Sequence, residues 1–155
     1  MAMREQRLCW LAVILLLAGT VSAQEKRIKR SALPAAVEKT VVERSKGATI
    51  RGFSTEEENG QITYEVEMLV NGHSKDVQIA ANGVVLEIEE QVDWEGLSPE
   101  VRAGLQSRAG KGTIGKVESI RKKDKLLAYE AQFVTNGKKA AVQTGPDGKP
   151  LDHRE

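Results

Sequence analysis

Two similar stretches of this sequence lie 65 residues apart, and this repetition constrains the fold more than any other feature. ITYEVEMLVNGHSKDVQIAANGVVL occupies residues 62–86, and LAYEAQFVTNGKKAAVQTGPDGKPL occupies residues 127–151. The identical pairs include apolar, polar and turn-forming residues: Tyr64/Tyr129, Glu65/Glu130, Asn71/Asn136, Gly72/Gly137, Val77/Val142, Gln78/Gln143, Gly83/Gly148 and Leu86/Leu151. A repeat of this kind predicts two structurally equivalent units.

A segment with helical spacing of apolar residues precedes each stretch. In the first segment, Leu33, Val37 and Val41 recur every four residues. The second opens with Ser98-Pro99-Glu100, which combines a capping serine, a proline suited to the first turn and an acid near the N-terminus. Glycine follows both segments and predicts the end of each helix.

After each helical segment the apolar residues alternate instead, which predicts β-strands. In residues 62–70, Tyr64, Val66 and Met68 are expected to face the core. The opposite face of that strand carries Thr63, Glu65, Glu67 and Leu69. Tight hairpin turns of type I′ are predicted at four dipeptides, because both central positions of that turn need positive φ: Asn71-Gly72, Asn82-Gly83, Asn136-Gly137 and Asp147-Gly148.

These patterns predict an α+β fold of two tandem repeats. Each repeat is expected to be one helix packed on a three- to four-stranded antiparallel meander, because a sheet with one apolar face needs a cover. The expected parts are a signal peptide at 1–23, a flexible basic lead-in at 24–30, unit one at 31–92, a linker at 93–97 and unit two at 98–155. Trp94 lies in that linker, and either the seam between the units or the protein surface is its expected place.

The N-terminus has the three parts of a secretory signal peptide. Arg4 and Arg7 form a basic start, residues 8–19 are apolar, and Val21-Ser22-Ala23 is a small-residue cleavage site. We expect cleavage after Ala23 and export to the periplasm or the medium, with no stable membrane span afterwards; an uncleaved anchor is the alternative. Cleavage would also remove the single cysteine, which excludes disulfides and cysteine zinc sites from the exported chain.

Charge is distributed unevenly along the chain. Residues 24–95 carry a net charge of −5, and residues 96–155 carry +5. Two interpretations are open: pairing between oppositely charged halves, or two solvated surfaces of unequal composition.

No segment has the residue pattern of an active site. His73 and His153 are isolated from any metal-binding motif, and the acidic run 56–58 is typical of a solvated turn. The basic cluster 121–125 lacks the interleaved aromatics of a nucleic-acid site. The sequence therefore predicts no enzyme, no catalytic residue, no cofactor, no metal and no nucleic-acid partner.

Three motifs resemble the PepSY-like domains: the helix opening LPAAVEKTV, the strand ITYEVEM, and DVQIAANGVVL after the Asn-Gly turn. That superfamily includes the units of small secreted proteins similar to β-lactamase inhibitors, and the resemblance covers residues 31–152. It implies a tandem PepSY-like protein that is non-enzymatic and extracytoplasmic. Related domains are linked with inhibition or regulation of secreted enzymes, peptidases among them. This chain departs from the inhibitors in having no cysteine and few aromatics after the signal.

The expected function is that of an exported protein-binding module, an inhibitor or regulator of a secreted or periplasmic enzyme. Its partner would be an extracytoplasmic protein. The predicted binding face is the sheet face opposite the helices, which carries Glu65, Glu67, Leu69, Glu130, Gln132 and Val134. The alternative is a periplasmic domain that binds a small ligand or ion on the same face.

Overall fold

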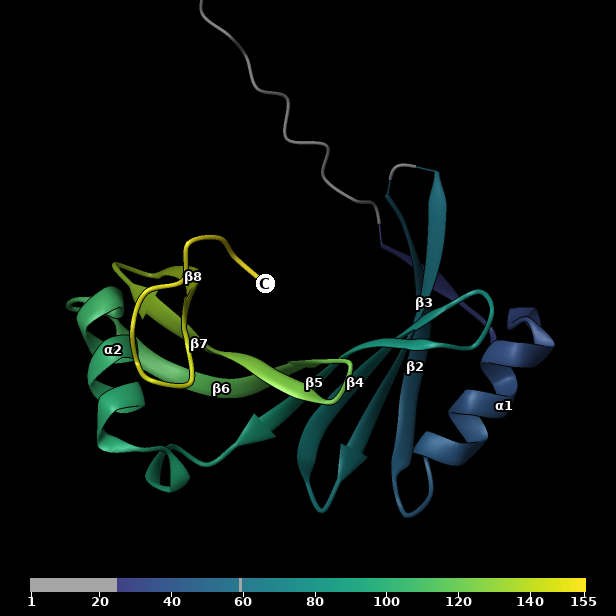
Figure 1. Cartoon of the computed structure of the whole chain (residues 1–155), viewed down its shortest axis with the longest axis horizontal. Coiled ribbons are helices and arrows are strands. Elements are labelled where there is room, and N and C mark those ends of the chain that lie inside the picture. The colour runs from purple at the N-terminus through teal and green to yellow at the C-terminus, as the bar shows by residue number, and fades with distance from the viewer. Residues whose placement is uncertain (1–24, 59) are drawn as a thin grey trace, which may run out of the picture.

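The computed structural model describes residues 25–155 apart from Asn59, so the predicted signal peptide lies outside it (Figure 1). The strands are β1 (Lys26–Ile28), β2 (Thr49–Glu58), β3 (Gln61–Val70), β4 (His73–Ala80), β5 (Val85–Val92), β6 (Thr113–Lys122), β7 (Lys125–Thr135) and β8 (Lys138–Thr144). The α-helices are α1 (Ala35–Arg44) and α2 (Pro99–Ala109), and the 3-10 turns are η1 (Arg30–Ala32) and η2 (Trp94–Gly96).

All eight strands form one antiparallel sheet in chain order, from β1 to β8. The predicted fold class of two tandem helix-on-meander repeats is therefore wrong. The two expected meanders are joined because β5 pairs with β6, from Glu87 opposite Lys122 to Val92 opposite Val117. Two separate sheets would each leave an edge of unpaired backbone groups here, and the pairing satisfies both.

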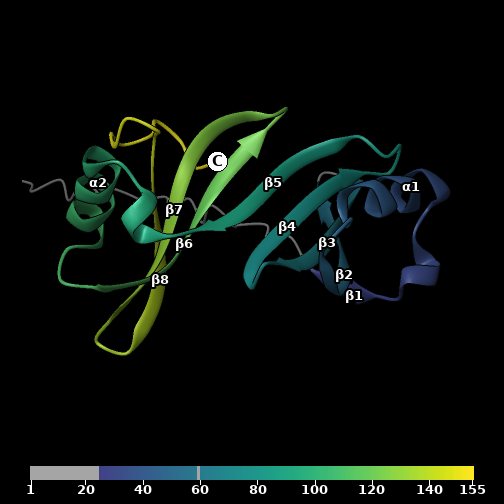
Figure 2. The ribbon, with the colours of Figure 1, turned by 90° about the horizontal axis from the view of Figure 1, so that it is seen from below.

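Both helices cover the same face of this sheet. Val37 and Val41 of α1 are buried in one apolar cluster together with Ile88 of β5. Val92, also on β5, packs against the cluster around α2, as does Trp94. Residues 88 and 92 point to the same side of a strand because side chains alternate. Figures 1 and 2 show the helices at opposite ends of the twisted sheet.

The helix boundaries agree with the local sequence. The hydroxyl of Ser98 accepts a hydrogen bond from the backbone N–H of Val101 at 3.2 Å and caps α2. Pro34 occupies the corresponding cap position before α1. Gly47 has a φ of +76°, a conformation that favours glycine, and it follows the end of α1 as predicted.

Two of the four predicted type I′ turns are confirmed. Both residues of Asn71-Gly72 and of Asn136-Gly137 have positive φ. At Asn82-Gly83 and at Asp147-Gly148 only the glycine does, so those two predictions are wrong. The side-chain oxygen of Asn82 accepts a hydrogen bond from the backbone N–H of Val84 at 3.1 Å, which holds a different turn.

The segment predicted as a flexible basic lead-in contains β1, which pairs with β2 at one edge of the sheet. Arg27 of this strand makes an ion pair of 2.7 Å with Glu67 on β3. Among the described residues, no helix is long and apolar enough to cross a bilayer.

Candidate functional site: the sheet face opposite the helices

The face of the sheet opposite the helices is defined by strand register. Residues directly opposite one another in neighbouring strands lie on the same face. One row crosses the sheet from Ser54 through Glu65, Gln78 and Glu87 to Lys122. We call the surface that contains this row the open face.

Carboxylates outnumber cations on the open face and at its margins. The acids are Glu25, Glu56, Glu65, Glu67, Asp76, Glu87, Glu89, Glu118, Glu130 and Glu155. The cations that pair with them are Arg27, Lys116, Lys122 and Arg154. Some of these carboxylates have no cation of the described residues within ion-pair distance. The open face therefore divides into a part with few ion pairs, called the unpaired part, and a part in which the carboxylates are paired, called the paired part.

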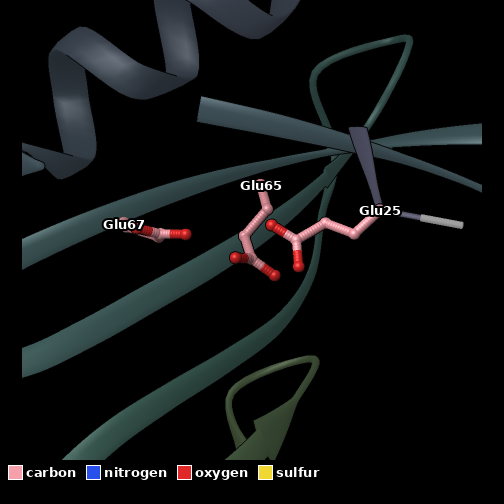
Figure 3. Close-up of side chains that lie close together, drawn as sticks. All are labelled: Glu25, Glu65 and Glu67. Carbon is pink, nitrogen blue, oxygen red and sulfur yellow. The ribbon is translucent and has the colours of Figure 1, made fainter. Parts of the chain in front are cut away.

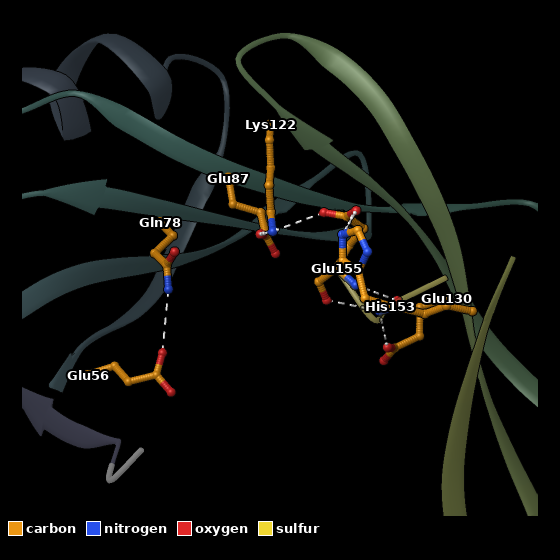
Figure 4. A network of polar contacts seen from close by, with 8 residues as sticks. Glu56, Gln78, Glu87, Lys122, Glu130, His153 and Glu155 are labelled. Carbon is orange, nitrogen blue, oxygen red and sulfur yellow. Dashed lines mark hydrogen bonds and ion pairs between the residues drawn. The ribbon is translucent and has the colours of Figure 1, made fainter. Parts of the chain in front are cut away.

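The unpaired part is a depression of about 190 Å³ across strands β2 to β5, which we call the acidic hollow. Its lining is five carboxylates and one amide: Glu56, Glu65, Asp76, Gln78, Glu87 and Glu89. Gln78 donates a hydrogen bond of 3.4 Å to Glu56, and Lys122 approaches Glu87 at 3.2 Å (Figure 4). Among the described residues, Lys122 is the only cation within ion-pair distance of this lining.

Three carboxyl groups of the acidic hollow, those of Glu65, Asp76 and Glu89, have raised pKa values. Burial, followed by repulsion from Asp76, raises the pKa of Glu65 to about 7. Burial, followed by repulsion from Glu118, raises the pKa of Asp76 to about 6. Burial, a hydrogen bond that protonated Glu89 donates to Glu87, and repulsion from Glu118 raise the pKa of Glu89 to about 8. The hollow thus gathers desolvated carboxylates that lack cationic partners.

Two triads of carboxylates on this face have oxygens within 4.8 Å of one another and could hold a metal ion. Glu25, Glu65 and Glu67 form the first, in which the carboxylates of Glu25 and Glu65 lie side by side (Figure 3). The second is Asp76, Glu89 and Glu118. Each triad already contacts a cation of the chain, because Arg27 pairs with Glu67 and Lys116 pairs with Glu118 at 2.6 Å.

The paired part of the open face lies on strands β6 to β8. Glu118 is 3% exposed and accepts hydrogen bonds from Lys116 at 2.6 Å and from the Ser74 hydroxyl at 3.2 Å. Glu130 accepts from Arg154 at 2.6 Å and from the Gln143 amide at 2.9 Å. Each carboxylate in this part has a donor within reach.

The last residues of the chain cross this part of the sheet. The side-chain amide of Gln143 forms two hydrogen bonds with the backbone of Glu155, of 2.9 and 3.2 Å. The carboxylate of Glu155 also pairs with Lys122 at 3.2 Å and with His153 at 3.1 Å (Figure 4). The segment is thereby fixed to β6 and β8.

A second depression, of about 600 Å³, lies on strands β6 to β8, and we call it the apolar groove. Gly115, Val134 and Ala141 line it, and Val134 is 43% exposed. Lys116 and Arg154 also line it. A β-bulge between Ile114 and Val117 interrupts the register of β6 with β7 at this position.

The six residues predicted to bind a partner divide between the two parts. Glu65 lines the acidic hollow and Glu67 lies next to it on β3, with Leu69 further along the same strand. The other three line the apolar groove: Glu130, Gln132 and Val134. The strands β3 and β7 are four strand spacings apart, or about 19 Å. The predicted face thus holds two separate clusters.

Sequence reasoning missed the acids that complete the hollow. Asp76 and Glu89 alternate with apolar residues on β4 and β5, so continuing the period-two analysis beyond β3 would have placed them beside Glu65. Glu118 had no such signal. It approaches Asp76 and Glu89 because β5 pairs with β6, and no turn sequence between these two strands predicts that pairing.

The sequence matches no family model and no curated protein. Several solved structures share its fold. A DUF2874 family protein from Bacteroides ovatus is 18% identical, with a TM-score of 0.60 over 77% of this chain and 85% of its own. A BLIP-like protein from Bacteroides fragilis is 19% identical, with a TM-score of 0.57 over 78% and 85%. The chain therefore has a BLIP-like fold.

A third structure, from Bacteroides eggerthii, has a TM-score of 0.62 at 13% identity over 77% of this chain and 86% of its own. That protein is provisionally described as periplasmic. Identities this low establish likeness of fold alone.

Proposed function

We propose that this chain is an exported, non-enzymatic protein-binding module that acts in the periplasm or the medium. Its open face binds an extracytoplasmic protein, and the contact residues are those on β3 and β7: Glu65, Glu67, Leu69, Glu130, Gln132 and Val134. Through this contact it inhibits or regulates a secreted or periplasmic enzyme.

One observation carries this proposal: α1 and α2 both cover one face of the sheet, and the opposite face carries neither helix and is strongly charged. A sheet face that served only as a solvated surface would gain nothing from partly desolvated carboxyl groups such as Glu65 and Glu89, which neighbouring acids repel. Such groups destabilise the free protein, and they are typical of functional surfaces.

Location and mode of action have separate support. The basic start, apolar run and small-residue motif of residues 1–23 support export. The periplasmic description of the Bacteroides eggerthii structure agrees with it. The BLIP-like structure from Bacteroides fragilis supports binding of another protein.

The test is capture of a partner from an envelope extract by the immobilised exported protein. The double variant Glu65→Lys with Glu67→Lys should recover at least fivefold less of a stoichiometric partner at low salt, and the deficit should shrink as salt screens the charges. The matched control is Glu43→Lys with Glu95→Lys, on α1 and η2. Equal capture by both double variants, with both folded by circular dichroism, would remove the open face as the site.

The alternative, binding of an ion or small ligand, has one specific observation in its favour: the two carboxylate triads of the open face. A thermal shift with calcium or magnesium chloride separates the two functions. A rise in melting temperature that Glu89→Gln abolishes, without any captured protein, would favour the ion-binding function.

A further inference from the structure

The open face carries the acidic hollow and the apolar groove at a fixed distance from each other. This distance limits which segment of a partner protein can contact both. Building on the proposed function, we infer that the partner presents an extended segment with an apolar side chain for the apolar groove and arginine or lysine side chains for the acidic hollow. The hollow is centred near β4 and the groove near β7, which are three strand spacings or about 14 Å apart. Gln91 and Glu130 both lie opposite Glu118. Val134 is therefore six residues, or about 20 Å, further along the strands than Glu89. The two offsets combine to about 24 Å, which an extended chain covers in about seven residues.

The apolar groove supplies the apolar part of the contact, between charged side chains that also line it. Val134 is 43% exposed, and Gly115 and Ala141, which have no side chain or a small one, line the groove beside it. An apolar side chain placed there would remove Val134 from water, and buried anchors of this kind dominate the energy of protein interfaces.

The acidic hollow supplies the charged half. Glu65, Asp76 and Glu89 are partly desolvated before any partner arrives, and each is repelled by neighbouring acids. A guanidinium or ammonium group would relieve this repulsion without the full cost of desolvating fresh carboxylates.

The chain itself shows that basic side chains bind the open face in this way. Arg27, on the edge strand β1, pairs with Glu67 at 2.7 Å. Arg154, in an irregular segment, pairs with Glu130 at 2.6 Å. These contacts lie on either side of the hollow, whose centre holds no arginine in the part of the chain that the structure describes. A basic side chain of the partner would form a third ion pair of this kind, in the hollow between the other two.

The experiment is selection of a random twelve-residue peptide library on the immobilised exported protein. Enriched sequences should carry an apolar residue about seven positions from an arginine or lysine. Two variants test the halves of the contact: Val134→Asp should weaken binding of an enriched peptide about tenfold, and Glu65→Gln with Glu89→Gln about fivefold at low salt. Their matched controls are Val42→Asp and Glu43→Gln, both on exposed positions of α1, which should leave binding unchanged.

Each other outcome has a defined meaning. Enriched peptides that are acidic or uncharged, but that lose binding in the open-face variants, would overturn the inference and leave the proposed function standing. Enriched peptides that bind those variants normally and lose binding in the α1 controls would overturn both. A library that yields no sequence enriched over the Val134→Asp protein would also overturn the inference.

Discussion

Both parts of the open face consist of antiparallel strands, but the surroundings of their carboxyl groups differ. On β6 to β8, Glu118 and Glu130 each accept hydrogen bonds from a cation and from a neutral side chain. On β2 to β5, Glu65 and Glu89 face other acids and keep raised pKa values. The first arrangement stabilises the fold, and the second makes ionisation of Glu65 and Glu89 unfavourable.

The uneven charge of the sequence explains this difference. Residues 24–95 carry −5 and residues 96–155 carry +5, so cations are scarce where the hollow forms. Pairing between the two halves was one interpretation of that asymmetry. Among the ion pairs of the described residues, only the contact of Lys122 with Glu87 joins the two halves. The remaining acids of the hollow stay unpaired.

The largest expected effect comes from breaking the paired part. Lys116→Met removes the ammonium group from the nearly fully buried Glu118, and a buried carboxylate without its partner is strongly destabilising. We expect a loss of about 2 kcal/mol, since Lys116 is itself partly exposed. Chemical denaturation measures the change. Lys111→Met, at an exposed position of the loop before β6, is the control, and an equal loss there would contradict this account.

The next effect has the opposite sign and lies in the unpaired part. Glu89→Gln removes one charge from the hollow, and its amide can still donate a hydrogen bond to Glu87. At pH 9, where Glu89 is ionised, we expect the variant to be more stable than the parent by about 1 kcal/mol. Thermal unfolding should show a rise of about 3 °C. A destabilised variant would mean that Glu89 is held by contacts other than those described.

A dependence of stability on pH follows from the same residues. Glu65 and Glu89 bind protons more tightly in the folded chain than in the unfolded chain, where their pKa is near 4.5. Their contribution is therefore fully present below pH 4.5 and is lost as pH rises through about 7 and 8. The melting temperature should fall between pH 6 and 9, and Glu65→Gln with Glu89→Gln should flatten the curve. An equally steep curve for that double variant would refute the assignment.

The smallest expected effect is at an exposed pair. Arg154→Ala removes the ion pair with Glu130, but the arginine side chain is 63% exposed and Gln143 still donates to the carboxylate. We expect a loss of about 0.5 kcal/mol that disappears in high salt. Denaturation at two salt concentrations checks it, with Arg102→Ala on α2 as the control. A loss as large as that of Lys116→Met would place Arg154 in the structural core of this region.

Local features of the fold were predictable because their causes are local. The cap at Ser98, the glycine after α1 and the turns at Asn71-Gly72 and Asn136-Gly137 each depend on a few neighbouring residues. The single sheet depends on the pairing of β5 with β6, and α2 lies between these two strands in the sequence. No short turn motif predicts that pairing. The candidate site was only partly predictable for the same reason. Alternation on β3 revealed Glu65, whereas Glu118 comes close to Asp76 and Glu89 only through the distant pairing of β5 with β6.

The pairing of β5 with β6 also has a consequence for how the chain acquires its structure. From β2 to β5 and again from β6 to β8, tight turns join neighbouring strands, and contacts between them are close in sequence. The junction of β5 and β6 must instead close over residues 93–112, and closing a longer loop costs more chain entropy. We therefore expect two hairpin assemblies to form early and this junction to form last, so that the speed of folding is set there.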